Sequence, residues 1–216
     1  MAVLLLPLLV SCGADDEAVE TPLPVATLPG VYAGTFPCDG CPGVPTTLWL
    51  RSGAVYFLEQ QYSTEDAPRS IASLGRWAWS AETGELTLRG AGPARRFTRP
   101  DADSLVLVTP SPLEHRITRD RSLGPFTGAI RLEGMVHPSA GEDRFIECVT
   151  GMRVPLQRGL DYRSFARQYR HTGGGGKPVF VEFDGQFSWH DDRSIADVAM
   201  ETFSTVRADG RCPPQP

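Results

Sequence analysis

Short segments of alternating apolar and polar residues fill the chain from Gly30 to about Asp120. The segment Arg76 to Ser80, for example, places both of its tryptophans on one face, as a strand with one buried side does. Turn-forming residues separate these segments at the spacing of meanders and barrels. The pattern predicts a small antiparallel β-barrel with strands at Val31 to Phe36, Thr46 to Leu50, Ala54 to Tyr62, Ile71 to Trp79, Glu85 to Leu88, around Phe97, Leu105 to Val108 and His115 to Thr118.

The segment Ser122 to Pro125 predicts a junction between a barrel domain at 30–121 and a second domain at 122–216. In the second domain the period changes at Tyr162 to a helical one, with Asp161 as the expected N-cap. Strands are expected at Gly128 to Val136, Arg144 to Val149, Met152 to Leu156, Pro178 to Phe187 and Val198 to Val206, with a helix at Tyr162 to Arg170 that stops at Gly173. Three strands, a helix and two strands is the order of an OB fold. The sequence therefore predicts a mainly β protein made of two small barrels.

The first twelve residues have the pattern of a secretion signal. Val3 to Val10 form an apolar block that is too short to span a bilayer, and Ser11-Cys12 follows directly. Leu9 to Cys12 resembles the lipobox of bacterial lipoproteins, in which the cysteine receives lipid and becomes the first residue of the mature chain. This resemblance implies a signal peptide at 1–11 and a lipid anchor on Cys12.

Residues 12–29 are predicted to form a tether between the lipid and the first barrel. They contain three prolines after Cys12 and no basic residue, and their acidic residues are Asp15, Asp16, Glu17 and Glu20. Such a composition does not order itself. Gly13 follows the cysteine where an aspartate would retain a lipoprotein in the inner membrane, so the lipoprotein resemblance implies an outer-membrane anchor facing the periplasm.

Charge and composition exclude several partners. The chain has 21 Lys and Arg against 26 Asp and Glu, a formal net charge of -5. OB folds often bind single-stranded nucleic acid through basic grooves, but the second domain is close to neutral and offers no overall electrostatic attraction for a polyanion. No apolar run reaches the roughly 18 residues of a spanning helix. We therefore expect no nucleic-acid partner.

The cysteines indicate disulfides. Five are present, and four remain when Cys12 is assigned to lipid, an even number in a chain exported to an oxidising compartment. Of the three possible connectivities, pairing within each domain is the simplest, which joins Cys38 to Cys41 and Cys148 to Cys212. The long loop should stabilise the fold by about 4 kcal/mol and the short one by about 2 kcal/mol. We expect the bridge between Cys148 and Cys212 to be structural and the bridge between Cys38 and Cys41 to be labile.

The CxxC sequence at Cys38 and Cys41 has three interpretations: a small disulfide, a redox centre or a metal site. A redox centre of the thioredoxin type needs a helix after the first cysteine, and Pro42 to Pro45 prevents one. Two thiolates suit the soft ion Cu(I), but no second CxxC, Cys-His pair or methionine cluster lies nearby in the sequence. A small disulfide is favoured, and a Cu(I) site at the two cysteines remains an alternative.

The segment Gly30 to Gly43, GVYAGTFPCDGCPG, followed by a strand rich in Thr and Leu, resembles the NlpE family of copper-resistance and envelope-stress lipoproteins. The second half is similar to the same family through Phe145 to Gly151, Pro178 to Glu182 and the terminal Cys212. The chain departs from the family at Asp39-Gly40, where Ala-Asp is common, so the carboxylate lies one position earlier.

The family resemblance implies a lipocalin-like first barrel and a second, OB-fold barrel that a disulfide closes. It also implies a protein without catalytic activity or a required cofactor, which signals copper, surface contact or failed disulfide formation to a sensor kinase. Two other functions stay open on the residues alone. One is a periplasmic Cu(I)-binding lipoprotein without a signalling role, and the other is a thiol-disulfide oxidoreductase that uses Cys38 and Cys41.

Other candidate sites carry less weight. Gly173 to Gly176 with Lys177 has the composition of a phosphate loop, but Pro178 stands where that motif needs Ser or Thr. His190 to Asp192 offers metal ligands but is more typical of a solvated turn. No hydrolase motif is present, and we expect surface or hydrogen-bonded core positions for the scattered histidines His115, His137 and His171.

Overall fold

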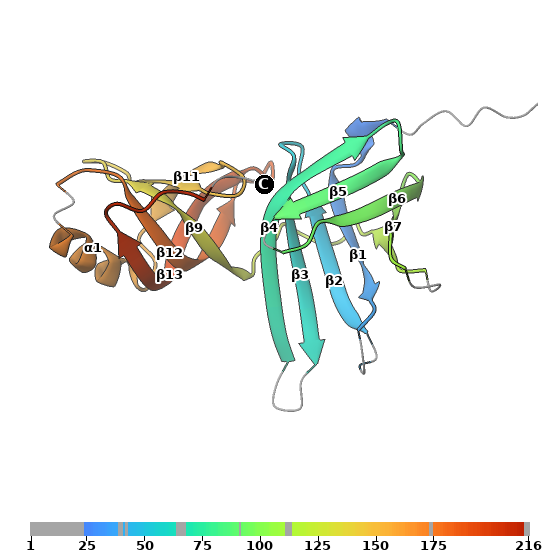
Figure 1. Cartoon of the computed structure of the whole chain (residues 1–216), viewed down its shortest axis with the longest axis horizontal. Helices are drawn as coiled ribbons and strands as arrows, with labels where there is room; N and C mark the ends of the chain where they lie inside the picture. The colour runs from blue at the N-terminus through green and yellow to red at the C-terminus, as the bar shows by residue number, and fades with distance from the viewer. Residues whose placement is uncertain are drawn as a thin grey trace, which may run out of the picture.

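The structure is a computed structural model that describes residues 24–38, 41, 43–63, 68–90, 92–110, 114–172 and 175–213. Two closed barrels follow one another along the chain and lie side by side (Figure 1). The predicted fold class is confirmed. The expected signal peptide, Cys12 and most of the expected tether lie outside the described residues. Within the described ranges, no helix has the length and apolar character that crossing a membrane requires.

The first barrel is an eight-stranded antiparallel meander, preceded by a short 3-10 helix at Val25–Thr27. Each strand pairs with the next, and the last pairs with the first, which gives the up-and-down order of lipocalin barrels. The strands are β1 (Gly30–Phe36), β2 (Val44–Leu50), β3 (Val55–Ser63), β4 (Pro68–Ser80), β5 (Glu85–Gly90), β6 (Arg95–Asp101), β7 (Ser104–Leu107) and β8 (Arg116–Arg119).

Large side chains fill the interior of this barrel. The tryptophan face of β4 points inward, where Trp77 is buried and Trp79 packs against the same cluster. The indole N–H of Trp77 donates to the carbonyl oxygen of Arg51 at 2.9 Å, so burial leaves this polar group satisfied. The first barrel therefore encloses a packed core.

The second barrel has the strand order β10-β11-β13-β12-β9, in which β11 and β13 run parallel and the other neighbours antiparallel. The single helix of this domain lies between β11 and β12, as in an OB fold. The elements are β9 (Ala129–His137), β10 (Arg144–Glu147), β11 (Arg153–Gln157), α1 (Tyr162–His171), β12 (Val179–Trp189) and β13 (Ile195–Arg207).

The predicted N-cap position of α1 is confirmed. Asp161 occupies the N-cap position, but its side chain makes no hydrogen bond to a helix amide. Its carboxylate instead accepts the backbone N–H of Phe203 on β13 at 3.0 Å. Hydrogen bonds from the Ser164 side chain and from this amide lower the pKa of Asp161. Asp161 thus ties the start of α1 to the barrel wall.

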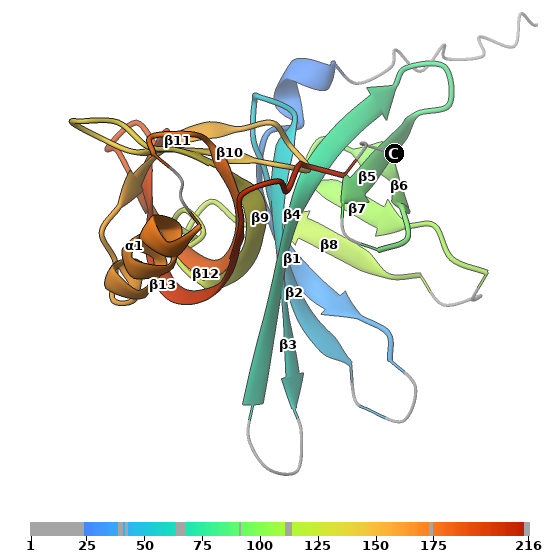
Figure 2. The ribbon, with the colours of Figure 1, turned by 60° about the vertical axis from the view of Figure 1, so that its left-hand side comes forward.

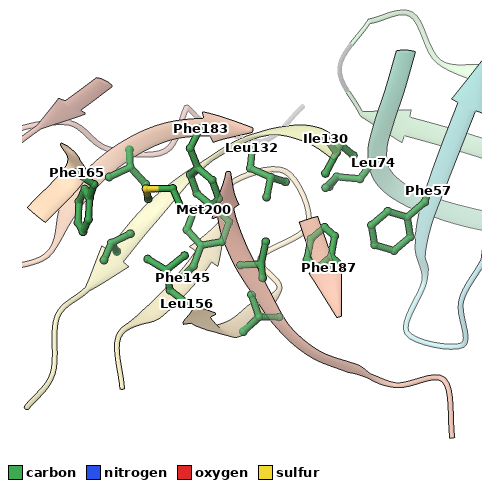
Figure 3. Packing of buried hydrophobic residues seen from close by; sticks show 14 of the residues in the cluster. Phe57, Leu74, Ile130, Leu132, Phe145, Leu156, Phe165, Phe183, Phe187 and Met200 are labelled. Atoms are coloured by element: carbon green, nitrogen blue, oxygen red, sulfur yellow. The ribbon is translucent and has the colours of Figure 1, made fainter. Parts of the chain in front are cut away.

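The two barrels share one apolar cluster. Phe57 on β3 and Leu74 on β4 point away from the first barrel and join the core of the second (Figure 3). The Phe57 ring stacks on Phe126 with centroids 5.2 Å apart and meets Phe187 edge-on at 5.3 Å. Phe57 is 0% exposed, so the second barrel buries this side chain on the outer face of the first barrel completely. Such an apolar interface holds two domains as one unit.

Polar contacts frame this apolar interface. The indole N–H of Trp49 donates to the carbonyl oxygen of Gly124 at 2.8 Å. The guanidinium of Arg51 lies 4.6 Å from the centroid of the Trp189 ring. Figure 2 shows β4 running past the second barrel, with the segment after β13 leading toward it. The segment after β13, up to residue 213, and the disulfide that holds it therefore lie near the junction of the barrels.

Candidate functional sites

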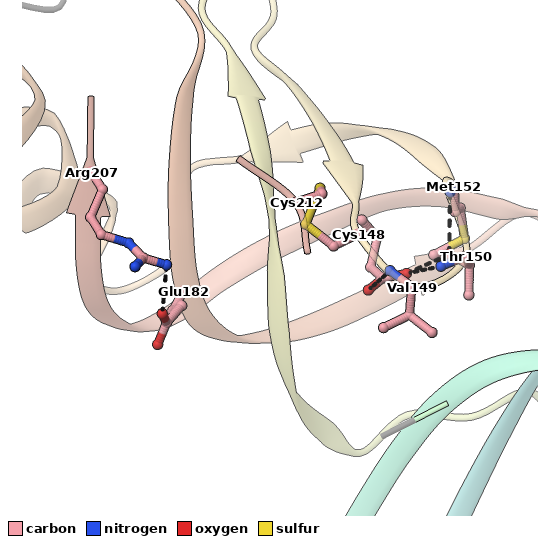
Figure 4. Close-up of a disulfide and its surroundings, with 8 residues drawn as sticks. Cys148, Val149, Thr150, Met152, Glu182, Arg207 and Cys212 are labelled. Atoms are coloured by element: carbon pink, nitrogen blue, oxygen red, sulfur yellow. Dashed lines mark hydrogen bonds and ion pairs between the residues drawn. A yellow bond between two sulfur atoms is a disulfide. The ribbon is translucent and has the colours of Figure 1, made fainter. Parts of the chain in front are cut away.

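The first candidate site is the disulfide between Cys148 and Cys212, whose Cα atoms are 5.2 Å apart (Figure 4). Cys148 is 5% exposed and lies in the turn that follows β10. Cys212 lies in the segment that follows β13. The bridge therefore fastens the last part of the chain to a turn that is 64 residues earlier.

A buried carboxylate organises this turn, which we name the bridge turn (residues 147–151). Glu147 is 2% exposed, and its carboxylate accepts the backbone N–H of Val149 at 2.9 Å and that of Thr150 at 2.6 Å. The Thr150 hydroxyl donates to the same carboxylate. Gly151 closes the turn with a φ of 68°, which favours glycine. These bonds compensate for burying the charge and hold the turn in one shape.

The bridge turn also contacts the first barrel. The guanidinium of Arg76 on β4 donates to the carbonyl oxygen of Thr150 at 2.7 Å. A groove of ≈ 180 Å³ lies beside this contact and is lined by Arg76, Trp77, Arg89 and Val149, among others. No sequence pattern indicates this contact, because Arg76 and Thr150 are brought together only by the packing of the two barrels.

The second candidate site is the disulfide between Cys38 and Cys41 in the turn from β1 to β2, with Cα atoms 5.6 Å apart. Cys41 is exposed and Cys38 is half-buried. Gly43 leads into β2 with a φ of 125°, and a Cβ there would lie 2.4 Å from the Thr35 methyl carbon. In the described part of this region, strands flank the turn on both sides and no helix begins at Cys38, so no helix dipole there stabilises a Cys38 thiolate.

The described residues contain no group of three or more His, Cys, Asp or Glu side chains that could hold a metal ion. When reduced, Cys38 and Cys41 would offer two sulfur ligands to Cu(I), and further ligands would have to come from elsewhere. His137 and His171 are exposed. His115 is buried at 9% exposure, and among the described residues its Nε2 has no hydrogen-bond partner, so the expectation of a surface or satisfied position is wrong for this atom.

Two other motifs have structural roles. The Lys177 carbonyl oxygen accepts the Tyr169 hydroxyl at 3.1 Å, and the glycine-rich segment follows α1 rather than preceding a helix. Phosphate loops lie at helix N-termini, so this segment lacks their geometry; Gly173 and Gly174 lie outside the described residues. His190 to Asp192 belongs to the tight turn between β12 and β13, where Asp192 accepts the backbone N–H of Ser194 at 2.8 Å.

Comparison with known proteins gives three kinds of match. Residues 32–112 match the model of the NlpE N-terminal domain. The chain is 27% identical over 201 residues to Lipoprotein NlpE of Escherichia coli (strain K12), which covers 87% of this chain and 82% of that protein. Among solved structures, the Cpx pathway activator NlpE from Escherichia coli is 23% identical, with 85% of this chain and 97% of that chain covered and a TM-score of 0.35. A putative lipoprotein from Shewanella oneidensis is 25% identical, with 44% and 90% covered and a TM-score of 0.36. The domain match and the long alignment confirm that this chain resembles the NlpE family.

Proposed function

We propose that the protein is a lipid-anchored envelope protein that reports failed disulfide formation to a signalling partner and performs no catalysis. The observation that carries this proposal is the position of the Cys148–Cys212 disulfide. The bridge ends in a turn that also contacts the first barrel through Arg76 and Thr150. Its redox state is therefore able to alter both the chain end and the junction of the barrels.

The physical steps of such a report are short. Reduction removes the constraint that holds the segment after β13 against the bridge turn. The turn keeps its internal hydrogen bonds to Glu147 and the bond from the Cys148 N–H to the Glu133 carbonyl oxygen on β9, but loses its covalent link to the segment after β13. The contact between Arg76 and Thr150 then has less support, and the surfaces beside the bridge turn become available to a partner.

Anchoring and location belong to the same proposal. Cys12 carries the lipid, the outer membrane holds the anchor, and the two barrels face the periplasm. The lipobox-like sequence supports this, and so does the sequence likeness to a protein named a lipoprotein. Metabolic labelling with palmitate should mark the protein, and Cys12→Ala should abolish the label. A label that survives this substitution contradicts the anchor.

The partner is an envelope-stress sensor kinase. The Escherichia coli relative, which aligns with most of this chain, is described as a Cpx pathway activator, and this supports a signalling role for the chain. The setting of Cys38 and Cys41 between two strands supports a role without thiol-disulfide catalysis. Purified protein should therefore fail to reduce insulin disulfides catalytically.

The deciding experiment removes the periplasmic disulfide oxidase of the host. Cys148 and Cys212 should become partly reduced, and an envelope-stress reporter should rise only in cells that contain this protein. Cys148→Ala should raise the reporter even with the oxidase present, whereas Cys38→Ala should leave the redox response intact. Equal effects of the two substitutions, or catalytic insulin reduction that Cys38→Ala abolishes, would contradict the proposal.

A second function, copper homeostasis, is favoured by one observation. Cys41 is exposed and Cys38 half-buried, so a reductant and Cu(I) reach this pair more easily than they reach Cys148. Titration of the reduced protein with Cu(I) against a competing chelator should show binding that Cys38→Ala abolishes and Cys148→Ala does not. Binding that is unchanged by Cys38→Ala would contradict a copper site here.

A further inference from the structure

An arginine-rich groove lies along α1, at the end of the second barrel that points away from the first (Figure 1). Its volume is ≈ 830 Å³, and it is open to solvent. The residues that line it are Arg158, Gly159, Leu160, Tyr162, Arg163, Ala166, Arg167 and Arg170. We name the four arginines and Leu160 the α1 arginine face.

The spacing along α1 explains why the cations gather on one side. Phe165 is buried and packs against the barrel with the rings of Tyr162 and Tyr169. Arg163, Arg167 and Arg170 follow at intervals of four and three residues, which places them on one side of a helix. No Asp or Glu lies within α1 to offset them. Like charges at this spacing repel each other, and only Arg170, in the last turn, gains from the helix dipole.

The arginines of the α1 arginine face have neutral partners but no acidic ones among the described residues: Arg158 lies 5.6 Å from the centroid of the Tyr162 ring, and Arg167 donates to the Ser164 hydroxyl at 3.4 Å. Many other arginines of the protein form ion pairs, for example Arg119 with Asp103 at 2.8 Å and Arg116 with Glu114 at 2.8 Å. Among the described residues, no ion pair includes an arginine of the α1 face. Asp161 is near enough for Arg167 to help lower its pKa, but its carboxylate is directed to the Phe203 amide. The face thus keeps most of its positive charge for an outside ligand.

Leu160 adds an apolar element to the groove that the arginines line. It is 87% exposed, whereas the other exposed large hydrophobic residues of the described chain lie between 38% and 47%. It directly precedes Asp161 and α1 and lines the same groove as the arginines. A leucine that protrudes among cations is typical of surfaces that meet a lipid bilayer, where cations bind headgroups and the apolar side chain enters the acyl region.

We propose that the α1 arginine face binds an anionic phospholipid surface. The guanidinium groups contact lipid phosphates, which their planar forks match in geometry, and Leu160 inserts beside them. A bilayer fits better than an acidic protein because Leu160 protrudes from the surface. The twelve residues from 12 to 23 span at most about 40 Å when extended, so the proposed anchor on Cys12 would hold the first barrel near a bilayer, and α1 at the far end of the second barrel would meet that bilayer when the molecule lies along it. The binding itself does not require the anchor.

The test uses residues 24–216 without lipid, which contain both apolar cores of the structure. They should co-sediment with vesicles that contain phosphatidylglycerol and not with vesicles of phosphatidylcholine alone. The triple variant Arg163→Gln, Arg167→Gln, Arg170→Gln should bind about a hundred-fold more weakly, or about five-fold for each arginine near the membrane surface. Far-UV circular dichroism should show that the triple variant is folded, because its substitutions remove repulsion along α1.

A charge-matched control separates the face from overall charge. The variant Arg69→Gln, Arg153→Gln, Arg211→Gln removes three exposed arginines outside the groove and should bind vesicles almost as the unchanged protein does. Equal loss in the two triple variants would overturn the proposal. So would equal binding to both kinds of vesicle.

The insertion of Leu160 is tested separately. Emission from the Leu160→Trp variant should shift to the blue with phosphatidylglycerol vesicles, and this shift should be absent with phosphatidylcholine vesicles. Unchanged emission would overturn the lipid assignment. Tighter binding to polyglutamate than to the vesicles would also overturn it, in favour of an acidic protein partner. Neither result bears on palmitate labelling or the redox reporter, so the proposed function is tested independently.

Discussion

The two disulfides of this protein differ in what they hold. The bridge between Cys38 and Cys41 closes a turn between adjacent strands, with a sequence separation of 3. The bridge between Cys148 and Cys212 has a separation of 64 and joins the chain end to a turn that contacts the other barrel. Breaking the first affects one turn between adjacent strands, whereas breaking the second releases the segment after β13 from a turn that lies far from it in the sequence. A cysteine pair is therefore suited to report on the whole fold only where its bridge joins distant parts of the chain.

The surroundings of the two bridges sharpen this difference. Cys41 is exposed, so its bridge opens and closes without disturbing a core. Cys148 is 5% exposed and follows Glu147, whose buried carboxylate is bonded within the bridge turn. A reductant therefore reaches the Cys38–Cys41 bridge first, and the Cys148–Cys212 bridge is expected to respond mainly when it fails to form during folding.

The largest expected effect comes from removing each bridge in turn. Cys148→Ala with Cys212→Ala should lower the free energy of unfolding by about 4 kcal/mol, because a long loop loses its closure. Cys38→Ala with Cys41→Ala should lower it by about 2 kcal/mol or less, because the loop is short. Urea unfolding followed by tryptophan fluorescence measures both. Similar losses in the two double variants would contradict the comparison.

The next effect concerns the carboxylate that shapes the bridge turn. Glu147→Gln keeps the size of the side chain but removes the charge that accepts two backbone amides and the Thr150 hydroxyl. Losing charge-assisted bonds in a buried site should cost about 1 to 3 kcal/mol, and dithiothreitol should reduce the Cys148–Cys212 bridge faster. Glu142→Gln removes an exposed charge of the same domain. It should change neither the free energy of unfolding nor the rate at which dithiothreitol reduces the bridge.

A smaller effect is expected where the bridge turn contacts the first barrel. Arg76→Gln removes the donor to the Thr150 carbonyl oxygen and should cost about 0.5 to 1.5 kcal/mol. In the reporter strain, Arg76→Gln should also reduce the difference in reporter signal between cells with oxidised protein and cells with reduced protein. Arg89→Gln, on the neighbouring strand position opposite Arg76, is the matched control. Equal effects of Arg76→Gln and Arg89→Gln would contradict a specific role for the hydrogen bond between Arg76 and Thr150.

The sequence predicts the strands and the strand order well because both depend on local patterns. Alternation along the chain identifies the eight strands of the first barrel, and the change to a helical period at Tyr162 identifies α1. Three strands, a helix and two strands then suffice for the OB order, which the parallel pairing of β11 with β13 completes.

The contacts between distant residues escape this kind of prediction. Three consecutive apolar residues, Tyr56, Phe57 and Leu58, are buried on β3, and such a run is a sign of burial on both faces of a strand. It does not say that the second barrel is the cover. Likewise, the near-neutral charge of the second domain conceals the α1 arginine face, because a sum over the domain includes acidic residues that lie elsewhere. Asp161 has a typical N-cap residue type, but the approach of β13 redirects its carboxylate.

The smallest effect tests whether loosening at the bridge stays local. Burial, and then the hydrogen bond that the Tyr162 hydroxyl donates to Asp143, raise the pKa of Tyr162 from 10.0 to about 12. Because the neutral form is favoured in the folded state, this contribution to stability is fully present below pH 10 and is lost as the pH rises toward about 12. Burial also raises the pKa of Tyr32 and of Tyr56, so an ultraviolet titration of tyrosinate in Tyr162→Phe should lose the contribution of one tyrosine near a pKa of about 12.

The same titration on the variant that lacks Cys148 and Cys212 tests whether loosening at the bridge stays local. Asp143 directly precedes β10, at the opposite end of this strand from Cys148, and its carbonyl oxygen accepts the Leu156 amide at 2.8 Å. These attachments do not involve the bridge, so the Tyr162 pKa should stay near about 12 when the bridge is removed. A fall toward 10 would mean that α1 and β10 separate as well. The bridge would then hold the whole second barrel, and the report would be global unfolding instead of a local release of the chain end.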